Sequence, residues 1–126
     1  MSPDSLLLRQ IHPDFIQNGR VTSQAFKPTP KDEGQLSVYD GEDIEPYPAY
    51  EHYTAQLKLS SAGVLAITSK ECEKHRLQVV KDGVPYPEHG YIDFTSLSES
   101  EAKKKAKLLA AAAMSRGWLY KAAPTS

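Results

Sequence analysis

The stretch from His12 to Gly41, HPDFIQNGRVTSQAFKPTPKDEGQLSVYDG, sets the organisation of the chain. Polar and apolar residues roughly alternate over 20–26, which predicts a strand, and a second strand is predicted over 35–39. The loop at 27–34 between them contains Pro28 and Pro30, which lack the N–H groups that a strand ladder needs. The stretch therefore predicts two strands that pair through a proline-containing loop.

Short apolar or alternating runs predict further strands at 63–68, 77–81 and 90–95. The run at 63–68, GVLAIT, is continuously apolar in its middle, which indicates a strand covered on both faces. The run at 6–11 is too short for its period to separate a strand from a helical turn. These runs indicate a sheet that draws strands from most of the chain.

Three helices are expected between and after the strands. Tyr50, Tyr53 and Leu57 fall on one face of a helix that ends near Ser60. The spacing of Thr68 and Glu71 suits a capping box, and it predicts a short helix through about residue 76.

The last helix has the strongest local signals. Ser98 and Glu101 form a second capping box, and Gly117 supplies the stop. A buried stripe at helical spacing is predicted from residues that are mostly alanine: Ala102, Ala106, Leu109 and Ala113. The small side chains indicate close packing on the sheet.

Together these elements predict one α+β domain over 1–126, with a mixed or antiparallel sheet of about five or six short strands. Three helices accompany the sheet, and the C-terminal helix packs on it. The ends, residues 1–5 and 121–126, are expected to be flexible.

Composition narrows the classes of function. The chain has 126 residues, a net charge of −1, 25% charged residues and one cysteine. A nucleic-acid-binding domain normally shows a basic patch, whereas the basic residues here are spread along the chain or accompanied by acids. No apolar run approaches the roughly 20 residues that span a bilayer. We therefore expect a cytoplasmic protein with no nucleic-acid or membrane partner.

Several motifs, taken in their order along the chain, are similar to those of a known family. The first is the run Gly19–Asp32 followed by Leu36-Ser37-Val38. The second is Gly63–Thr68 with Glu71-Cys72, and the third is Pro87-Glu88-His89. In this order the motifs resemble a family of small uncharacterised bacterial proteins. The resemblance implies a bacterial origin. It implies no activity, cofactor or partner.

The single cysteine offers little chemistry. Cys72 and His75 have C-x-x-H spacing, but a structural zinc site needs four nitrogen or sulfur ligands, usually in paired knuckles. Pairs such as Cys72 with His89, or Ser23 with His12, lack a recognisable nucleophile signature. The sequence favours a buried thiol beside an exposed histidine, and it indicates no metal and no cofactor.

An anion site is the most specific candidate. Positive charge and hydrogen-bond donors gather around one predicted hairpin, where the ligand-binding candidates are Arg20, Ser23, Gln24 and Lys31. His12 and Asp32 flank this group and are candidate acid and base, and His89 is a further candidate base. The alternative is a structured loop in which the lysines are solvated. No glycine-rich phosphate loop is present.

Two functions stay open. The first is a binding or accessory module that recognises another protein through tyrosine- and proline-rich loops, because tyrosines such as Tyr47, Tyr86 and Tyr91 suit interfaces. The second is a small enzyme or ligand-binding domain for a phosphate-bearing, nucleotide-like molecule at the 12–32 region. The sequence slightly favours the first and leaves open whether the protein is an enzyme.

Overall fold

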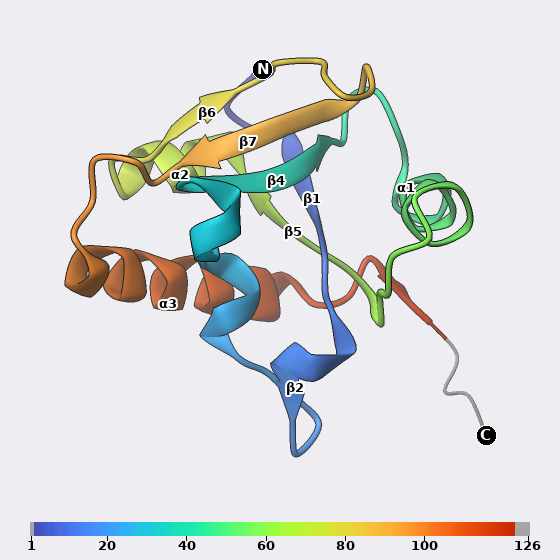
Figure 1. The fold of residues 1–126 in the computed structure, drawn as a ribbon, viewed down its shortest axis with the longest axis horizontal. Coiled ribbons are helices and arrows are strands. Elements are labelled where there is room, and N and C mark those ends of the chain that lie inside the picture. The colour runs from blue at the N-terminus through green and yellow to red at the C-terminus, as the bar shows by residue number, and fades with distance from the viewer. Residues whose placement is uncertain (1, 123–126) are drawn as a thin grey trace.

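The computed structural model describes residues 2–122 and shows a single α+β domain (Figure 1). A six-stranded antiparallel sheet has the order β6-β7-β4-β1-β5-β8. Its strands are β1 (Leu6–Gln10), β4 (Gln35–Asp40), β5 (Gly63–Thr68), β6 (Gln78–Val80), β7 (His89–Asp93) and β8 (Tyr120–Lys121). A small hairpin of β2 (Ile16–Gln17) and β3 (Arg20–Val21) stands apart from this sheet. The predicted fold class is confirmed.

Three α-helices accompany the sheet: α1 (Pro46–Glu51), α2 (Ser69–Lys74) and α3 (Glu99–Arg116). Helix α1 continues as a π-helical turn, His52–Gln56. Three 3₁₀ turns occupy the segment between β1 and β4: Pro13–Phe15, Ser23–Phe26 and Pro30–Asp32.

The local signals at α3 act as predicted. The Glu101 backbone N–H donates to Ser98 Oγ and the Ser98 backbone N–H donates to Glu101 Oε1, each at 3.1 Å. The predicted stripe is buried, and Ala106, Leu109 and Ala113 are at most 1% exposed. Helix α3 packs on β5 and on the Ser23–Phe26 turn. The prediction that the C-terminal helix covers the sheet is confirmed.

Each face of the sheet has its own apolar core. The larger core joins α3 to residues such as Leu7, Leu36 and Ile67. The smaller core, on the other face, joins Leu8 and Tyr39 to Ala49 of α1. Strand β5 contributes to both cores, and its residues 63–67 are buried, as the apolar run predicted.

Strands β1 and β4 separate soon after they meet. They pair only at Leu7↔Asp40 and Leu8↔Tyr39. Beyond that point β1 stays with β5 as far as Gln10, while β4 stays with β7 back to Gln35 (Figure 1). The chain between the two strands, residues 11–34, lies at the open end of the wedge that they form.

The expected strand over 20–26 is wrong. Within this range only Arg20–Val21 forms a strand, and it pairs with β2 rather than with β4. Ala25 and Phe26, which alternation would place on opposite faces, are both fully buried in the larger core. A 3₁₀ turn lets both neighbouring side chains enter the same core, so their burial favours the turn over the strand that the alternating pattern predicted.

The first helix is shorter than expected, because it ends at Gln56 rather than near Ser60. Lys58, just beyond it, has a positive φ of 56°. As a result, Leu57 and Leu59 are 37% and 49% exposed.

Of the ends expected to be flexible, residue 1 and residues 123–126 lie outside the described residues. Ser5 is buried, and its hydroxyl donates to Glu42. Tyr120–Lys121 pairs with β5 as an edge strand.

Candidate functional site

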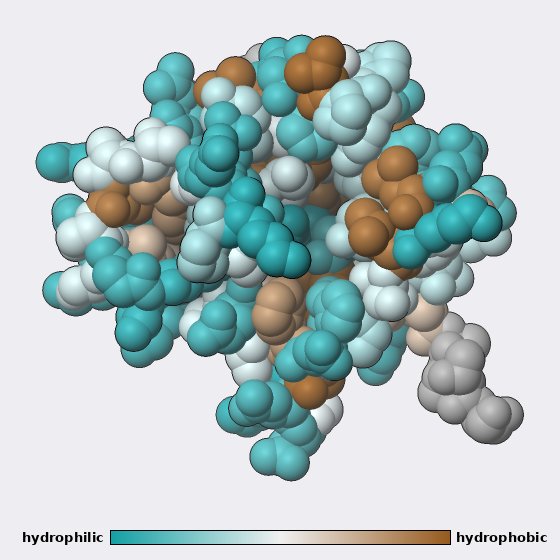
Figure 2. Space-filling model, viewed as in Figure 1, coloured by the Kyte–Doolittle hydropathy of each residue, from teal (hydrophilic) through white to brown (hydrophobic). Residues whose placement is uncertain are grey.

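The wedge between β1 and β4 contains a cavity of about 550 Å³. Its walls come from both strands, from the 12–32 segment, from the end of the π-helical turn and from the loop before β7. Figure 2 shows the viewed face hollowed near its centre, with apolar side chains beside the hollow on the side where Figure 1 draws α1. The volume falls within the range of small-molecule sites, roughly 300–1,000 Å³.

Arg9 places a positive charge in this cavity. Its Nε–H donates to the Ala25 carbonyl at 2.8 Å, and Nη1 donates to the Ser37 carbonyl at 2.9 Å. Among residues 2–122, no carboxylate lies within ion-pair distance of its guanidinium. Burial lowers the pKa of Arg9 from its usual value, although arginine remains charged in proteins. The cavity therefore contains a cation that no carboxylate of the described residues contacts, although the more distant Asp32 charge acts on it.

Gln10 adds a buried, unused donor to the wall of the cavity. The side chain is 6% exposed and lines the cavity. Its Oε1 accepts a hydrogen bond from Ser61 Oγ at 2.7 Å, whereas Nε2 has no partner among the described residues. An unpaired buried amide costs about 1–3 kcal/mol, so a ligand that accepts its N–H is favoured.

His89 stands on the opposite wall between two polar partners. It is 8% exposed; its Nδ1 lies 2.6 Å from Asp82 Oδ1, and its Nε2 lies 3.2 Å from Ser37 Oγ. Ser37 and His89 come from neighbouring strands and share a face, because Tyr39 pairs with His89 and Ser37 pairs with Tyr91. The predicted candidate base therefore lies at the cavity, with its ring oriented by a carboxylate.

An aromatic wall adjoins His89. The rings of Tyr39 and Tyr86 stack with centroids 5.1 Å apart, and His52 packs edge-on against Tyr86 at 4.6 Å. Tyr39 Oη and His52 Nδ1 share a hydrogen bond of 2.8 Å. Burial and the neighbouring Tyr86 phenol raise the pKa of Tyr39 well above its usual value. The two stacked phenol rings are suited to an apolar or flat ligand group.

The structure divides the residues that the sequence singled out. His12, Lys31, Asp32 and His89 line the cavity. Arg20, Ser23 and Gln24 do not, because Arg20 belongs to the separate hairpin and the other two belong to the turn beneath α3.

The candidate acid and base of the 12–32 segment already have structural partners. Asp32 Oδ2 accepts from the Thr29 backbone N–H at 2.8 Å and from Thr29 Oγ1 at 2.9 Å, which makes it a cap of the Pro30–Asp32 turn. His12 Nδ1 accepts from the Asp14 backbone N–H at 3.0 Å.

Sequence reasoning missed Arg9, Gln10, Ser37 and Asp82. A signal existed for the first two, because Arg9-Gln10 interrupts the apolar run Leu6–Ile11. A charged residue and an amide in an otherwise apolar strand indicate a polar environment inside the fold. Ser37 and Asp82 carry no comparable signal, since strands and turns commonly contain such residues.

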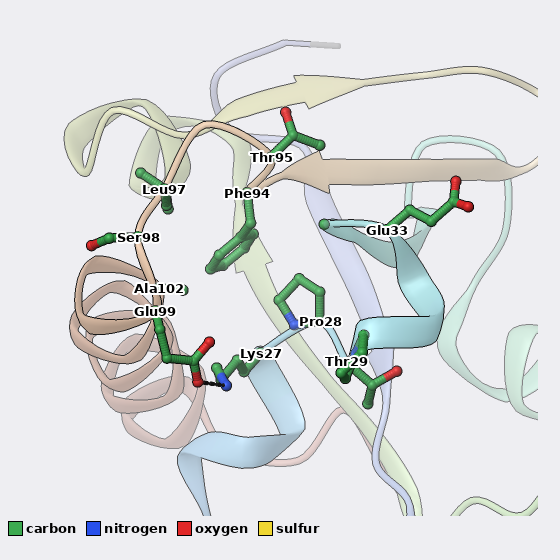
Figure 3. Close-up of a pocket in the computed structure, with 12 residues that line it drawn as sticks. Lys27, Pro28, Thr29, Glu33, Phe94, Thr95, Leu97, Ser98, Glu99 and Ala102 are labelled. Atoms are coloured by element: carbon green, nitrogen blue, oxygen red, sulfur yellow. Dashed lines mark hydrogen bonds and ion pairs between the residues drawn. The ribbon is translucent and has the colours of Figure 1, made fainter.

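A second cavity, of about 340 Å³, lies between the 27–34 loop and the start of α3 (Figure 3). The Lys27 ammonium forms an ion pair with Glu99 across it. That lysine is therefore paired directly with a carboxylate, unlike Arg9 in the first cavity.

Cys72 is fully buried in the larger core, and burial raises the pKa of its thiol to about 12. Within residues 2–122, no helix has the length and apolarity to cross a membrane.

Comparison with protein-family models, with curated proteins and with solved structures gives no match. The resemblance to a bacterial family therefore stays a prediction, and the site must be interpreted from its own geometry.

Proposed function

We propose that the protein binds a small organic anion in the cavity between β1 and β4. The observation that carries this proposal is Arg9, a partly buried cation that lines the cavity and has no carboxylate within ion-pair distance among the described residues. A partly desolvated charge that no carboxylate contacts is costly, and a bound anion offsets that cost. Gln10 Nε2, which has no partner among the described residues, offers a further N–H to the same anion.

The shape of the cavity indicates the rest of the ligand. Its walls combine the stacked Tyr39 and Tyr86 with the exposed apolar side chains of Leu57 and Leu59 at the rim. A carboxylate or phosphate monoester attached to an aromatic or aliphatic body fits a cavity with a cation on one side and apolar walls on the other. The guanidinium takes the anionic oxygens, because its fork of N–H groups matches them, and the wall takes the apolar body.

This proposal keeps the anion hypothesis of the sequence but moves its centre. The binding groups are Arg9 and Gln10 on β1 rather than Arg20, Ser23 and Gln24, while Lys31 remains at the cavity.

Calorimetric titration tests the proposal with three probes: phenylacetate, phenyl phosphate and the cation phenethylamine. We expect saturable binding of at least one anion and none of the amine. Arg9→Met should weaken that binding roughly 10- to 100-fold, because hydrogen bonds to charged groups contribute about 1.5–3 kcal/mol. Arg20→Met is the matched control, since this exposed arginine lies in the β2–β3 hairpin, and it should leave the affinity unchanged. Equal affinity in all three proteins would contradict the proposal.

Protein binding is the second candidate function. It is supported by the apolar side chains of Tyr47, Leu59 and Val84, which are 49%, 49% and 61% exposed. Tyr47 packs with Tyr50 and Tyr120, whereas Tyr86 belongs to the cavity wall, so these two tyrosines lie in different aromatic clusters. Replacing Tyr47, Tyr86 and Tyr91 together should abolish capture of a partner if this candidate is correct, and unchanged capture would count against it.

A further inference from the structure

We propose that Ser37, His89 and Asp82 form a catalytic triad that hydrolyses esters of small carboxylic acids in this cavity. The inference rests on the proposed function, because the organic anion bound there would be the carboxylate product. It goes beyond binding by assigning a nucleophile, a base and a positioning residue.

The hydrogen-bond chain has the order that nucleophilic catalysis requires. Ser37 Oγ lies 3.2 Å from His89 Nε2, and His89 Nδ1 lies 2.6 Å from Asp82 Oδ1. Both distances fall within the reach of a nucleophile–base–carboxylate chain, about 2.6–3.2 Å. An imidazole that donates Nδ1–H to Asp82 leaves Nε2 free to accept the Ser37 proton.

Burial differs among the three residues of the triad in the way that catalysis requires. Ser37 is exposed and lines the cavity, whereas the side chains of His89 and Asp82 are only 10% and 24% exposed. The Gly83 backbone N–H donates to the His89 carbonyl at 3.1 Å, which ties the Asp82 turn to the start of β7. A substrate can therefore reach the nucleophile, while the base and its carboxylate stay in place.

Positive charge is available for the tetrahedral intermediate. Arg9 Nη1 donates to the Ser37 backbone carbonyl at 2.9 Å, so the guanidinium lies at the backbone of the residue that supplies the nucleophile. Gln10 also lines the cavity, and its Nε2 is a buried donor without a partner among the described residues. Donors aimed at a developing oxyanion in a partly dry site typically contribute 10²–10³ in rate.

The reaction balances with water as the second substrate. Ser37 Oγ attacks the ester carbonyl carbon and passes its proton to His89 Nε2. The bond to the leaving alcohol then breaks, and that oxygen takes the proton from His89. Water, deprotonated by the same imidazole, attacks the acyl-serine, and the carboxylic acid leaves as Ser37 Oγ recovers its proton. Asp82 orients the imidazole and stabilises its charged form throughout.

A fluorophosphonate tests the nucleophile directly, because serine attack on phosphorus expels fluoride and leaves a stable adduct. Mass spectrometry of the intact protein and of its peptides should place one adduct on Ser37. Ser37→Ala should abolish labelling, and His89→Gln should slow it at least 100-fold. Ser115→Ala, which alters an exposed serine of α3, should label like the unchanged protein.

The role of Asp82 as a positioning residue is tested by a measurement that a purely structural role would not change. Asp82→Asn should slow labelling and the hydrolysis of 4-nitrophenyl acetate by roughly 10²–10⁴, since the wrong imidazole tautomer is favoured. Its thermal midpoint and its affinity for phenylacetate should stay the same. Asp82→Glu should recover part of the rate. Because Asp82 is partly exposed, this variant remains informative if His89→Gln does not fold.

The outcomes separate this inference from the proposed function. No adduct, or an adduct on another residue, would overturn the triad even if phenylacetate binds, and anion binding would then stand alone. A Ser37 adduct that depends on His89 would support the triad even if no anion binds, and the proposed function would then fall. Equal labelling rates in the unchanged protein, His89→Gln and Asp82→Asn would overturn the triad.

Discussion

At the scale of single residues, polar groups determine what the cavity can do. Arg9 and Gln10 follow three leucines on β1, yet their donors lie where β1 and β4 have separated. Arg9 occupies this gap by donating to backbone carbonyls on both sides, those of Ala25 and Ser37. The same side chain therefore satisfies one carbonyl of the Ser23–Phe26 turn and one of β4, and it supplies the charge of the site.

Cys72 provides a prediction at this scale. Its thiol is fully buried, and burial raises its pKa to about 12, so the reactive thiolate is scarce at neutral or mildly basic pH. We expect iodoacetamide at pH 8 to leave the folded protein unmodified for hours and to alkylate it fully in denaturant. Mass spectrometry measures the extent of alkylation, and rapid alkylation of the folded protein would contradict the burial of Cys72.

At the scale of elements, α3 shows how much local sequence can determine. Its capping box, its alanine stripe and its glycine stop all involve residues close in sequence, so their pattern predicts them directly. The segment at 20–26 shows the opposite case. Its alternation favours a strand, but contacts with a helix more than 70 residues away hold Ala25 and Phe26 in a 3₁₀ turn.

The alanine stripe of α3 predicts a sharp asymmetry between neighbouring positions. Ala113 is fully buried in the larger core, whereas Ala111 is exposed. Ala113→Leu should destabilise the fold by about 1–3 kcal/mol, because extra methyl groups have no space against the sheet. Ala111→Leu should change the free energy of unfolding by less than about 0.5 kcal/mol. Urea denaturation measures both, and equal effects would show that α3 does not pack as described.

The N-terminal cap of α3 gives a smaller, separate effect. Ser98 Oγ accepts the Glu101 backbone N–H, and its removal leaves that donor without its cap. Ser98→Ala should therefore lower the free energy of unfolding by about 1 kcal/mol. Ser100→Ala, an exposed position inside the helix, is the control and should be nearly neutral or slightly stabilising. The same denaturation curves decide between these outcomes.

At the scale of the whole molecule, the site could not be predicted because four separate segments build it. Arg9 comes from β1, Ser37 from β4, Asp82 from the turn after β6 and His89 from β7. Their meeting depends on the strand order and on the early separation of β1 from β4. His12, Lys31, Asp32 and His89 were predicted from their chemistry alone, and the structure brings these four to the cavity.

Acid stability is a property of the whole chain. Hydrogen bonds lower the pKa values of several carboxyl groups, among them Glu42 through Ser5, Asp93 through Thr95 and Glu101 through Ser98. Burial alone would raise the pKa of Glu71, but hydrogen bonds from Arg116 and Thr68 outweigh it and lower the value.

Groups with lowered folded-state pKa values stabilise the fold above their unfolded pKa, about 4–4.5, and lose that contribution as the pH falls through the folded value. We therefore expect the free energy of unfolding to decrease steadily from about pH 5 to pH 3. Glu71→Gln should reduce this decrease, because it removes one titrating group. Urea denaturation at each pH measures this free energy. A value that stays constant or rises with acidification would contradict the lowered pKa values of these carboxyl groups.

The central claim is that the wedge between β1 and β4 binds an organic anion at Arg9 and Gln10. The most direct measurement is a ¹H–¹⁵N spectrum of the side-chain amide of Gln10 and the Nε–H of Arg9, recorded while phenylacetate is added. We predict that both signals shift and saturate together, while the Nε–H of Arg20 stays still. Unmoved Arg9 and Gln10 signals at millimolar phenylacetate and phenyl phosphate would contradict the claim.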